Sequence, residues 1–417
     1  MDRAAFIYLD HKEGPVPVGR LWSRIRNGRE SATFEYNEGW LHREDRFALE
    51  PALALTAGPH HTGGTMPVFG ALCDSAPDRW GRVLMRRAER RRAQLEGRTP
   101  RTLFEIDFLL SVDDEARAGA LRFAAEPGGP FLAPADGQRI PILVDLPRLL
   151  SATQRVVAQE DTDEDLRLLI APGSSLGGAR PKASVRDADG QLTIAKFPHK
   201  DDYANTVVWE AVALTLAERA GIRTATWRLE HIGETAVLLL RRFDRHGPHR
   251  FPLLSAMSML GAIDNEQRSY LEIAEVLQRH GAAPRKDLIE LWRRLVFNVL
   301  ISNTDDHLRN HAFLYEGLEG WRLSPAYDMN PVPIDVKPRI LSTSIMPDDP
   351  SASLMLALEA AEYFGLKPAD ANKIAKEVAT ATSSWRDVAG AYGLSARETE
   401  RMASAFQHSD YESAQGA

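Results

Sequence analysis

The sequence predicts an α+β protein whose first part is rich in β-strands and whose last part is mostly helical. Apolar runs of strand length recur up to residue 240, whereas apolar residues at helical spacing dominate after residue 253. A stretch rich in Pro and Gly at 125–141 is typical of a linker or long loop. We therefore predict domains over 1–125, 126–250 and 251–410, followed by a disordered tail over 411–417.

The composition is that of a soluble globular protein. Of the 417 residues, 44% are hydrophobic and 26% are charged, so the chain can build two or three domains with sizeable cores. The single cysteine, Cys73, excludes a disulfide framework and favours a reducing compartment. We see no signal peptide and no apolar run of membrane-spanning length, so we expect a cytoplasmic protein with no membrane partner. The net charge of −7 disfavours a surface covered throughout by nucleic acid.

The first segment begins with strands and continues with a helix. Residues 3–9, 17–22 and 32–36 have strand patterns, and a Gly14-Pro15 turn joins the first two. The stretch 78–96 predicts a helix with one apolar side, formed by Trp80, Val83, Leu84 and Ala88.

The opposite side of this predicted helix is basic. It carries Arg82, Arg86, Arg87, Arg90, Arg91 and Arg92. The basic stretch over 86–101 is one candidate surface for nucleic acid or an acidic partner. A solvated helix face is the alternative, which the interleaved Glu89 and Glu96 favour.

A loop of small residues over 174–182 precedes two predicted strands, 183–186 and 192–197. Gly177 and Gly178 would let the backbone approach a phosphate and point its N–H groups at it. The loop matches neither of the common glycine-rich phosphate motifs, so an ordinary glycine turn is the alternative.

Lys196 closes the second of these strands, as the lysine that contacts ATP closes a strand in protein kinases. A lysine exposed to solvent is the alternative. A predicted helix over 205–220 carries Glu210 near its start, which either pairs with Lys196 or lies in solvent. The apolar strand 235–240 then leads into residues 241–245, where a two-lobed kinase has the hinge that faces adenine.

The stretch 302–331 has the side chains that phosphoryl transfer requires. Asp305 and Asn310 have the spacing of the kinase catalytic loop, in which the Asp accepts the substrate proton and the Asn binds magnesium. Asp306 lies one residue too close to Asn310, so Asp305 is the better candidate base. A predicted β-hairpin over 311–323 would return Asp328 to the side of Asn310 as the second magnesium ligand. A loop of solvated Asx turns is the alternative.

With these motifs, the chain resembles the HipA toxin kinase family, the serine/threonine kinases of bacterial toxin–antitoxin modules. The resemblance covers nearly the whole chain, including IYLD, PVGRLW and PDRWGRVLM near the N-terminus. It is strongest in SSLGGARPKASV, IAKFP, LLLRRFDR, SNTDDHLRNHAF and LSPAYDMNPVP. The implied fold is a two-lobed, protein-kinase-like (HipA-like) fold with a β-rich N-terminal subdomain and a mostly helical C-terminal lobe.

The resemblance also implies an activity and its residues. The protein would be a serine/threonine kinase that uses ATP and Mg²⁺, with Asp305 as the base and Asn310 and Asp328 as the metal ligands. Ser175, or the adjacent Ser174, matches a serine that such kinases autophosphorylate, and a phosphate there would compete with ATP. The implied nucleotide-binding residues are Gly177, Gly178, Ala179, Arg180, Lys182, Lys196, Arg242, Phe243, His307, Asn310 and Asp328.

The family's partners follow as expectations. They are a small helix-turn-helix antitoxin, operator DNA through the antitoxin complex, and a protein substrate, for which aminoacyl-tRNA synthetases are the best-known case. Arg241 stands where the family's best-known member has an acidic residue, and FGALCDSAPDRWG departs from the usual pattern. Two other functions stay open: a small-molecule kinase of the aminoglycoside phosphotransferase type, and a non-catalytic corepressor bound to DNA.

Overall fold

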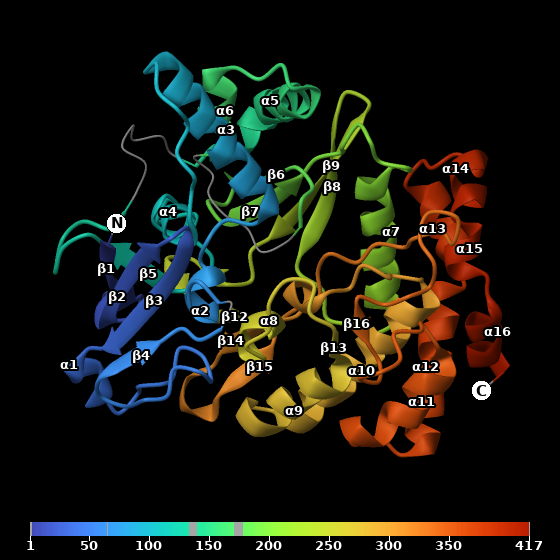
Figure 1. Ribbon diagram of the computed structural model, residues 1–417. Coiled ribbons are helices and arrows are strands. Elements are labelled where there is room, and N and C mark those ends of the chain that lie inside the picture. Colours follow the sequence, from blue (N-terminus) through green and yellow to red (C-terminus); the bar gives the residue numbers. More distant parts are fainter. Residues whose placement is uncertain (1, 65, 133–139, 171–177, 417) are drawn as a thin grey trace. The chain divides into compact units, whose positions relative to one another are not determined.

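The structure is a computed structural model that describes residues 2–64, 66–132, 140–170 and 178–416 (Figure 1). Strands gather in the first half of the chain and helices in the second, so the predicted α+β class is confirmed. The chain forms two compact units, Met1–Lys200 with His231–Ile263, and Asp201–Glu230 with Asp264–Ala417. The finer division at 125/126 and 250/251 stays a prediction.

The first unit begins with a five-stranded antiparallel sheet in the order β4-β3-β2-β1-β5. The strands predicted over 3–9, 17–22 and 32–36 are confirmed as parts of β1, β2 and β3. Gly19 in β2 is required by packing, because a Cβ there would lie 2.4 Å from the carbonyl oxygen of Glu35. The five strands are β1 (Asp2–Leu9), β2 (Val16–Arg26), β3 (Arg29–Tyr36), β4 (Pro59–His61) and β5 (Leu121–Ala124).

Four helices lie between β3 and β5 in the sequence, namely α1 (Glu38–Leu41), α2 (Gly70–Cys73), α3 (Arg79–Leu95) and α4 (Glu105–Leu110). Helix α3 is the helix predicted over 78–96, and Asp78 caps its N-terminus through the N–H of Gly81. Trp80 and Leu84 are buried as predicted, but Val83 is exposed and Met85 is buried in its place. The buried face of the helix is therefore slightly rotated from the face that the apolar spacing predicted.

The basic side of α3 is neither a free patch nor fully solvated. Three of its arginines form ion pairs within the first unit: Arg82 with Glu105, Arg87 with Asp161 and Arg91 with Asp163. Glu89, which sequence reasoning placed in solvent, is buried and pairs with Arg98. These long-range partners, absent from the local sequence, reduce the positive charge available for nucleic acid.

A second sheet of the first unit contains β6 (Lys182–Arg186), β7 (Leu192–Lys196) and β9 (Thr235–Arg241), all antiparallel. Its apolar side chains pack with α5 (Leu146–Ala158) and α6 (Asp163–Ile170) around Leu149, Val185 and Leu239. The chain passes between the two units within β8 (Trp227–Ile232). The remaining elements of the first unit are η1 (Leu143–Asp145), β10 (Arg245–His246), β11 (His249–Arg250), β12 (Leu253–Ser255) and α8 (Ala256–Met259).

The second unit is mostly helical, as predicted. The predicted helix over 205–220 is α7 (Thr206–Arg219), and α10 (Pro284–Leu300) is the long helix before the Asp305 loop. Helix α10 has Pro284 in its first turn, where a missing N–H costs nothing. The other helices are α9 (Tyr270–His280), η2 (Leu308–Asn310), η3 (Gly317–Glu319), α11 (Leu354–Glu359), η4 (Ala360–Phe364), α12 (Pro368–Thr382), α13 (Trp385–Ala391), α14 (Ala396–Arg401), α15 (Ala403–Phe406) and α16 (Ser409–Gly416). The short strands are β13 (Arg268–Ser269), β14 (Ala312–Tyr315), β15 (Trp321–Leu323) and β16 (Thr343–Ser344).

The predicted disordered tail over 411–417 is wrong for the residues that the structure describes. Residues up to 416 belong to helix α16, which contacts α11 and α12. Asp410 fixes the start of this helix, because its carboxylate accepts hydrogen bonds from the N–H of Leu354 and the guanidinium of Arg339. The small polar residues gave no local signal for these contacts. Among the described helices, none is both long and apolar enough to cross a membrane.

Glu50 makes the stability of the first unit depend on pH. Burial raises the pKa of this carboxyl from 4.5 to about 7, an effect that the Asp74 charge adds to and a hydrogen bond from the Ala71 N–H opposes. A raised folded-state pKa stabilises the protonated form, so stability is lost as the pH rises from 4.5 to about 7 and falls no further above it. Over this pH range we expect the free energy of unfolding of wild type to fall by about 3 kcal/mol relative to that of Glu50→Gln. Urea unfolding of both proteins at several pH values measures this difference, and parallel curves would contradict it.

Candidate functional site

The predicted hairpin after the Asp305 loop is present in the second unit. β14 pairs with β15 in antiparallel register, with Phe313 opposite Leu323, and η3 forms the turn. The loop itself begins directly after α10, where Ser302 has a left-handed backbone with φ of 52°. Such a conformation in a residue other than glycine is costly and often marks a functional loop. The sequence thus folds locally as a helix, a constrained loop and a hairpin.

The two neighbouring aspartates of this loop have different environments. The side chain of Asp305 is 71% exposed, whereas Asp306 is buried. Asp306 accepts hydrogen bonds from the hydroxyl of Tyr270 and from Nε2 of His311, the latter at 2.8 Å. Asp306 is therefore occupied inside the protein, and Asp305 is the carboxylate that can reach a substrate. This arrangement agrees with the choice of Asp305 made from the spacing.

The buried contacts of Asp306 support the loop from behind. Burial alone would raise the pKa of Asp306, but the charge of His311 and hydrogen bonds from His311 and Tyr270 lower it below the usual value. Burial and the Asp306 carboxylate raise the pKa of Tyr270, so its hydroxyl stays a donor. Asn298 donates to the same hydroxyl oxygen at 3.0 Å, and Asn303 donates to Asn298 at 3.0 Å. Sequence reasoning missed this network, because its members lie on α9, on α10 and in the loop that leads to β14.

Asn310 has an oxygen available for a metal. Its Nδ2 donates to the carbonyl oxygen of Asp305 at 3.3 Å, which turns the amide in a defined direction. Its Oδ1 is buried and has no hydrogen-bond partner among the residues that the structure describes. A buried oxygen without a partner is costly unless a ligand binds it. The atom fits the predicted role of a magnesium ligand.

Asp328 is held beside the same loop. The hydroxyl of Tyr327 donates to the carbonyl oxygen of Arg309 at 2.7 Å, and the Val332 N–H donates to the Ser302 carbonyl oxygen at 3.3 Å. Asp328 itself has a left-handed backbone with φ of 60° and accepts from Asn330 at 3.4 Å. A half-buried carboxylate on a segment bonded to this loop is a suitable second oxygen ligand.

These two residues fit Mg²⁺ better than a metal that is held by protein alone. The described residues contain no group of three or more His, Cys, Asp or Glu side chains placed to hold a metal ion. Magnesium commonly takes one or two protein oxygens and completes its shell with phosphate oxygens and water. His307, predicted to lie near the nucleotide, is half-buried, and its Nδ1 lacks a hydrogen-bond partner within the described part of the chain.

The predicted phosphate loop belongs to the first unit and is described only from Gly178 onward. Ser174, Ser175 and Gly177 lie outside the described residues. Of the other predicted contacts, Ala179 and Arg180 lie in the bend before β6. Lys182 is buried, and its Nζ lies 3.0 Å from Asp78 Oδ2 and donates to the Gly178 carbonyl oxygen at 2.8 Å. Lys182 therefore links the loop to the N-terminus of α3.

Lys196 lies directly opposite Lys182 in the pairing of β6 and β7. Two like charges at facing positions repel each other, and Asp78 offsets the charge of Lys182. Lys196 is half-buried, and Glu210 is buried, which contradicts the alternative of a glutamate in solvent. The pairing of these two residues, which belong to different units, stays a prediction, as does the approach of Lys196 to Asp305 and Asp328.

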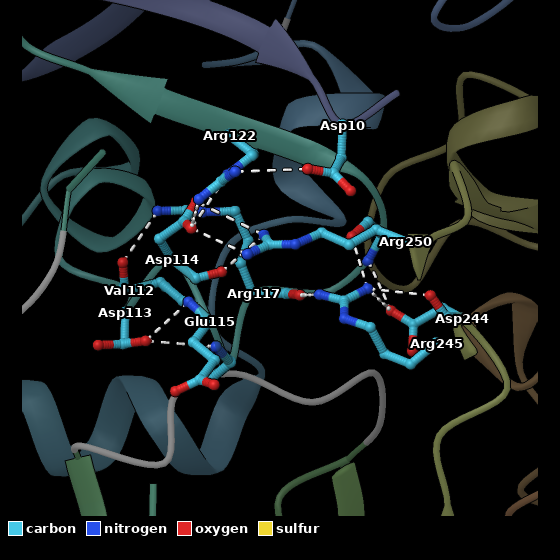
Figure 2. A network of polar contacts seen from close by, with 12 residues as sticks. Asp10, Val112, Asp113, Asp114, Glu115, Arg117, Arg122, Asp244, Arg245 and Arg250 are labelled. Atoms are coloured by element: carbon cyan, nitrogen blue, oxygen red, sulfur yellow. Dashed lines mark hydrogen bonds and ion pairs between the residues drawn. The ribbon is translucent and has the colours of Figure 1, made fainter. Parts of the chain in front are cut away.

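The predicted adenine hinge leads into a buried network of charges, part of which Figure 2 shows. The guanidinium of Arg242 donates to both carboxylate oxygens of Asp244, at 2.9 and 2.6 Å, and to the carbonyl oxygens of Ala116 and Arg117. The backbone N–H of Arg242 donates to the Leu192 carbonyl oxygen. The side chain and the backbone N–H of Arg242 are thus bonded within the first unit. Phe243 is half-buried.

Asp244 is the centre of this network. Its carboxylate also accepts from Arg245 at 2.9 Å and from the N–H of Gly119 at 2.8 Å. Burial alone would raise the pKa of Asp244, but the charges of Arg242 and Arg245 hold it far below the usual range. Arg250 continues the network to Asp114 at 2.9 Å. The segment after β9 is thereby joined to the segment before β5, and no local sequence pattern predicts these distant pairs.

The chain is similar to known proteins in sequence and in fold. Residues 174–385 match the family model of the HipA-like C-terminal domain. "Putative kinase Y4mE" of Sinorhizobium fredii is 27% identical over 327 residues, 71% of this chain and 71% of that protein. A "Putative kinase" of Haemophilus influenzae is 32% identical over 119 residues, 26% of this chain and 34% of that protein.

A solved structure also matches nearly the whole chain. It is that of the Shewanella oneidensis MR-1 toxin–antitoxin system HipA, HipB and its operator DNA. The TM-score is 0.68 at 17% identity, and the match covers 99% of this chain and 96% of that one. At 17% identity the match shows similarity of fold alone, and it confirms the predicted fold class.

Proposed function

Because this chain belongs to the family with a HipA-like C-terminal domain, we propose that it is an ATP- and Mg²⁺-dependent protein serine/threonine kinase and the toxin of a toxin–antitoxin module. One observation carries this proposal. The exposed carboxylate of Asp305 lies on the same constrained loop as Asn310, whose buried Oδ1 has no partner among the described residues. This pair provides a base and a metal ligand at the spacing that phosphoryl transfer requires.

The residues of the second unit account for the chemistry as follows. Asp305 accepts the proton of a substrate hydroxyl, which orients the oxygen toward the γ-phosphorus of ATP. Asn310 and Asp328 would hold Mg²⁺, which neutralises phosphate charge when it is bound. Asp306 stays ionised and holds the loop through Tyr270 and His311. Together these contacts keep the base and the metal ligands in fixed positions before the substrate arrives.

Residues of the first unit would bind the nucleotide. Lys182 and Lys196 face each other at one sheet end and supply the positive charge for phosphates, while Gly178 to Arg180 supply N–H groups. The chain segment that begins with Arg242 and Phe243 would lie along adenine. Autophosphorylation at Ser175 or Ser174 would add a dianion near these lysines and compete with ATP.

The proposed partners follow the assembly of the matched structure, which contains HipB and operator DNA. We propose a small helix-turn-helix antitoxin as the partner of this chain, with operator DNA bound through that complex. The internal ion pairs of α3 disfavour a direct role of its basic side in DNA binding. A protein substrate in translation, such as an aminoacyl-tRNA synthetase, is proposed from the family alone.

Nucleotide binding tests the metal site. We expect calorimetry to show Mg-ATP binding by wild type, and Asp328→Asn to weaken it by more than about tenfold, because one charged oxygen ligand of the metal is lost. Asp335→Asn, a change of the same kind at an exposed carboxylate on the same segment, is the control and should bind as wild type does. Equal affinity of wild type and Asp328→Asn would contradict the metal role.

A labelling experiment separates the protein kinase from a small-molecule kinase. The purified chain is incubated with Mg-ATP that is labelled on the γ-phosphate, digested and mapped by mass spectrometry. Label on Ser175 or Ser174 supports the protein kinase, whereas label transferred only to an added aminoglycoside would contradict it. A chain that binds no Mg-ATP at all would favour the non-catalytic corepressor.

A further inference from the structure

A lysine outside the predicted catalytic loop lies against the proposed base. Nζ of Lys337 is 3.5 Å from Oδ1 of Asp305 and donates to the carbonyl oxygen of Thr304 at 3.4 Å. All three residues belong to the second unit. The lysine follows Asp328 on the segment that returns to the loop, so the same segment supplies a proposed metal ligand and a cation.

The backbone of this segment is fixed where it meets the loop. The N–H groups of Val336 and Lys337 both donate to the carbonyl oxygen of Pro333, which closes a turn just before the lysine side chain. Ser342 donates to the Thr304 carbonyl oxygen through its N–H at 3.1 Å and through its hydroxyl at 2.9 Å. The position of Lys337 is therefore set on both sides by contacts to the turn and the loop.

A purely structural role explains this pair poorly. The side chains of Lys337 and Asp305 are 40% and 71% exposed, and ion pairs with such exposure add little to stability. Arg309, the arginine of the loop, is directed to another partner, because its guanidinium pairs with Asp264. Phosphoryl transfer spreads negative charge over the γ-phosphoryl oxygens, and a cation beside the base stabilises that charge.

We propose that Lys337 is a second catalytic residue, which holds the Asp305 carboxylate and donates a hydrogen bond to the phosphoryl group in transfer. This inference rests on the proposed kinase function. In the step, the acceptor oxygen forms a bond to the γ-phosphorus while the bond from that phosphorus to the β,γ-bridging oxygen breaks. The electron pair of the broken bond leaves with ADP, and the acceptor proton passes to Asp305. The ammonium of Lys337 keeps its proton throughout.

The test compares Lys337→Met with wild type in the full chain. Release of phosphate from ATP and incorporation of label into the chain are both measured. We expect kcat to fall roughly 100-fold, as for the loss of one donor to transition-state charge. Because ADP lacks the γ-phosphoryl group, affinity for Mg-ADP should stay within about twofold of wild type. Lys337→Arg retains the charge and should recover part of the lost rate.

Arg401→Met is the matched control. Arg401 Nη2 lies 3.1 Å from Oδ2 of Asp335, which is on the same segment as Lys337, and both side chains of this pair are about half exposed. The Arg401→Met variant should leave kcat unchanged. If Lys337→Met transfers phosphate at the wild-type rate, or loses Mg-ADP affinity together with its rate, the inference is overturned while the kinase function stands. If wild type itself transfers no phosphate, the proposed function fails, and the role of Lys337 fails with it.

Discussion

Asp305→Asn is expected to lower the rate of phosphoryl transfer by roughly 10²- to 10⁴-fold, the usual contribution of a general base. The amide keeps the shape of the side chain but cannot accept the substrate proton. Asp305 is exposed, and its recorded side-chain contact is the ion pair with Lys337. The fold should therefore tolerate the change, and the thermal midpoint should stay close to that of wild type.

The same substitution at the neighbouring residue provides the contrast. Asp306→Asn replaces the charged acceptor of Tyr270 and His311 with a neutral amide in a buried site, so it should lower stability as well as activity. Rates are measured as label transferred from γ-labelled ATP, and stability as the midpoint of thermal unfolding. In cells, Asp305→Asn should also abolish any growth arrest caused by expression. Undiminished arrest with this variant would show that toxicity does not depend on transfer.

Asp244→Asn is expected to destabilise the first unit by about 3–5 kcal/mol, because it leaves the buried charges of Arg242 and Arg245 without their carboxylate. Both guanidinium groups donate to Asp244, which is itself buried. The amide has one acceptor oxygen in place of two, so the N–H of Gly119 would compete with the guanidinium groups for it. Urea unfolding of the full chain measures the loss, and hydrogen exchange at the Gly119 amide localises it.

Asp189→Asn is the control for this prediction. Asp189 forms an ion pair at 2.6 Å with Arg241, the residue directly before Arg242. Both side chains of this pair are about half exposed. Such pairs contribute about 0–1 kcal/mol. Equal effects of the two substitutions would mean that burial of the Asp244 network does not govern the stability of the hinge segment.

The fold of the proposed catalytic loop and its hairpin could be predicted because the signals are local. The spacing of Asp305 and Asn310 and the hairpin that follows need only the residues between 302 and 323, and the structure confirms the hairpin. The separate environments of Asp305 and Asp306 also agree with that spacing. A local pattern of this kind predicts both the type of element and the position of a side chain within it.

Other features depend on partners that are distant in the sequence. Asp114 and Arg250, or Asp78 and Lys182, are ion pairs between segments that no periodicity connects. The order of the last residues has the same origin, because Asp410 acts through Arg339 and Leu354. Lys337 is a further case, since a lysine in a loop rich in Pro has no pattern that would place it beside Asp305.

The division of the chain has a consequence for its synthesis. The polypeptide passes between the units three times, after Lys200, Glu230 and Ile263. No single cut therefore releases either unit whole, and a ribosome must add residues up to Ile263 before the first one can close. A nascent chain that stops anywhere before α16 would carry an unfinished second unit, so we expect no phosphoryl transfer from it.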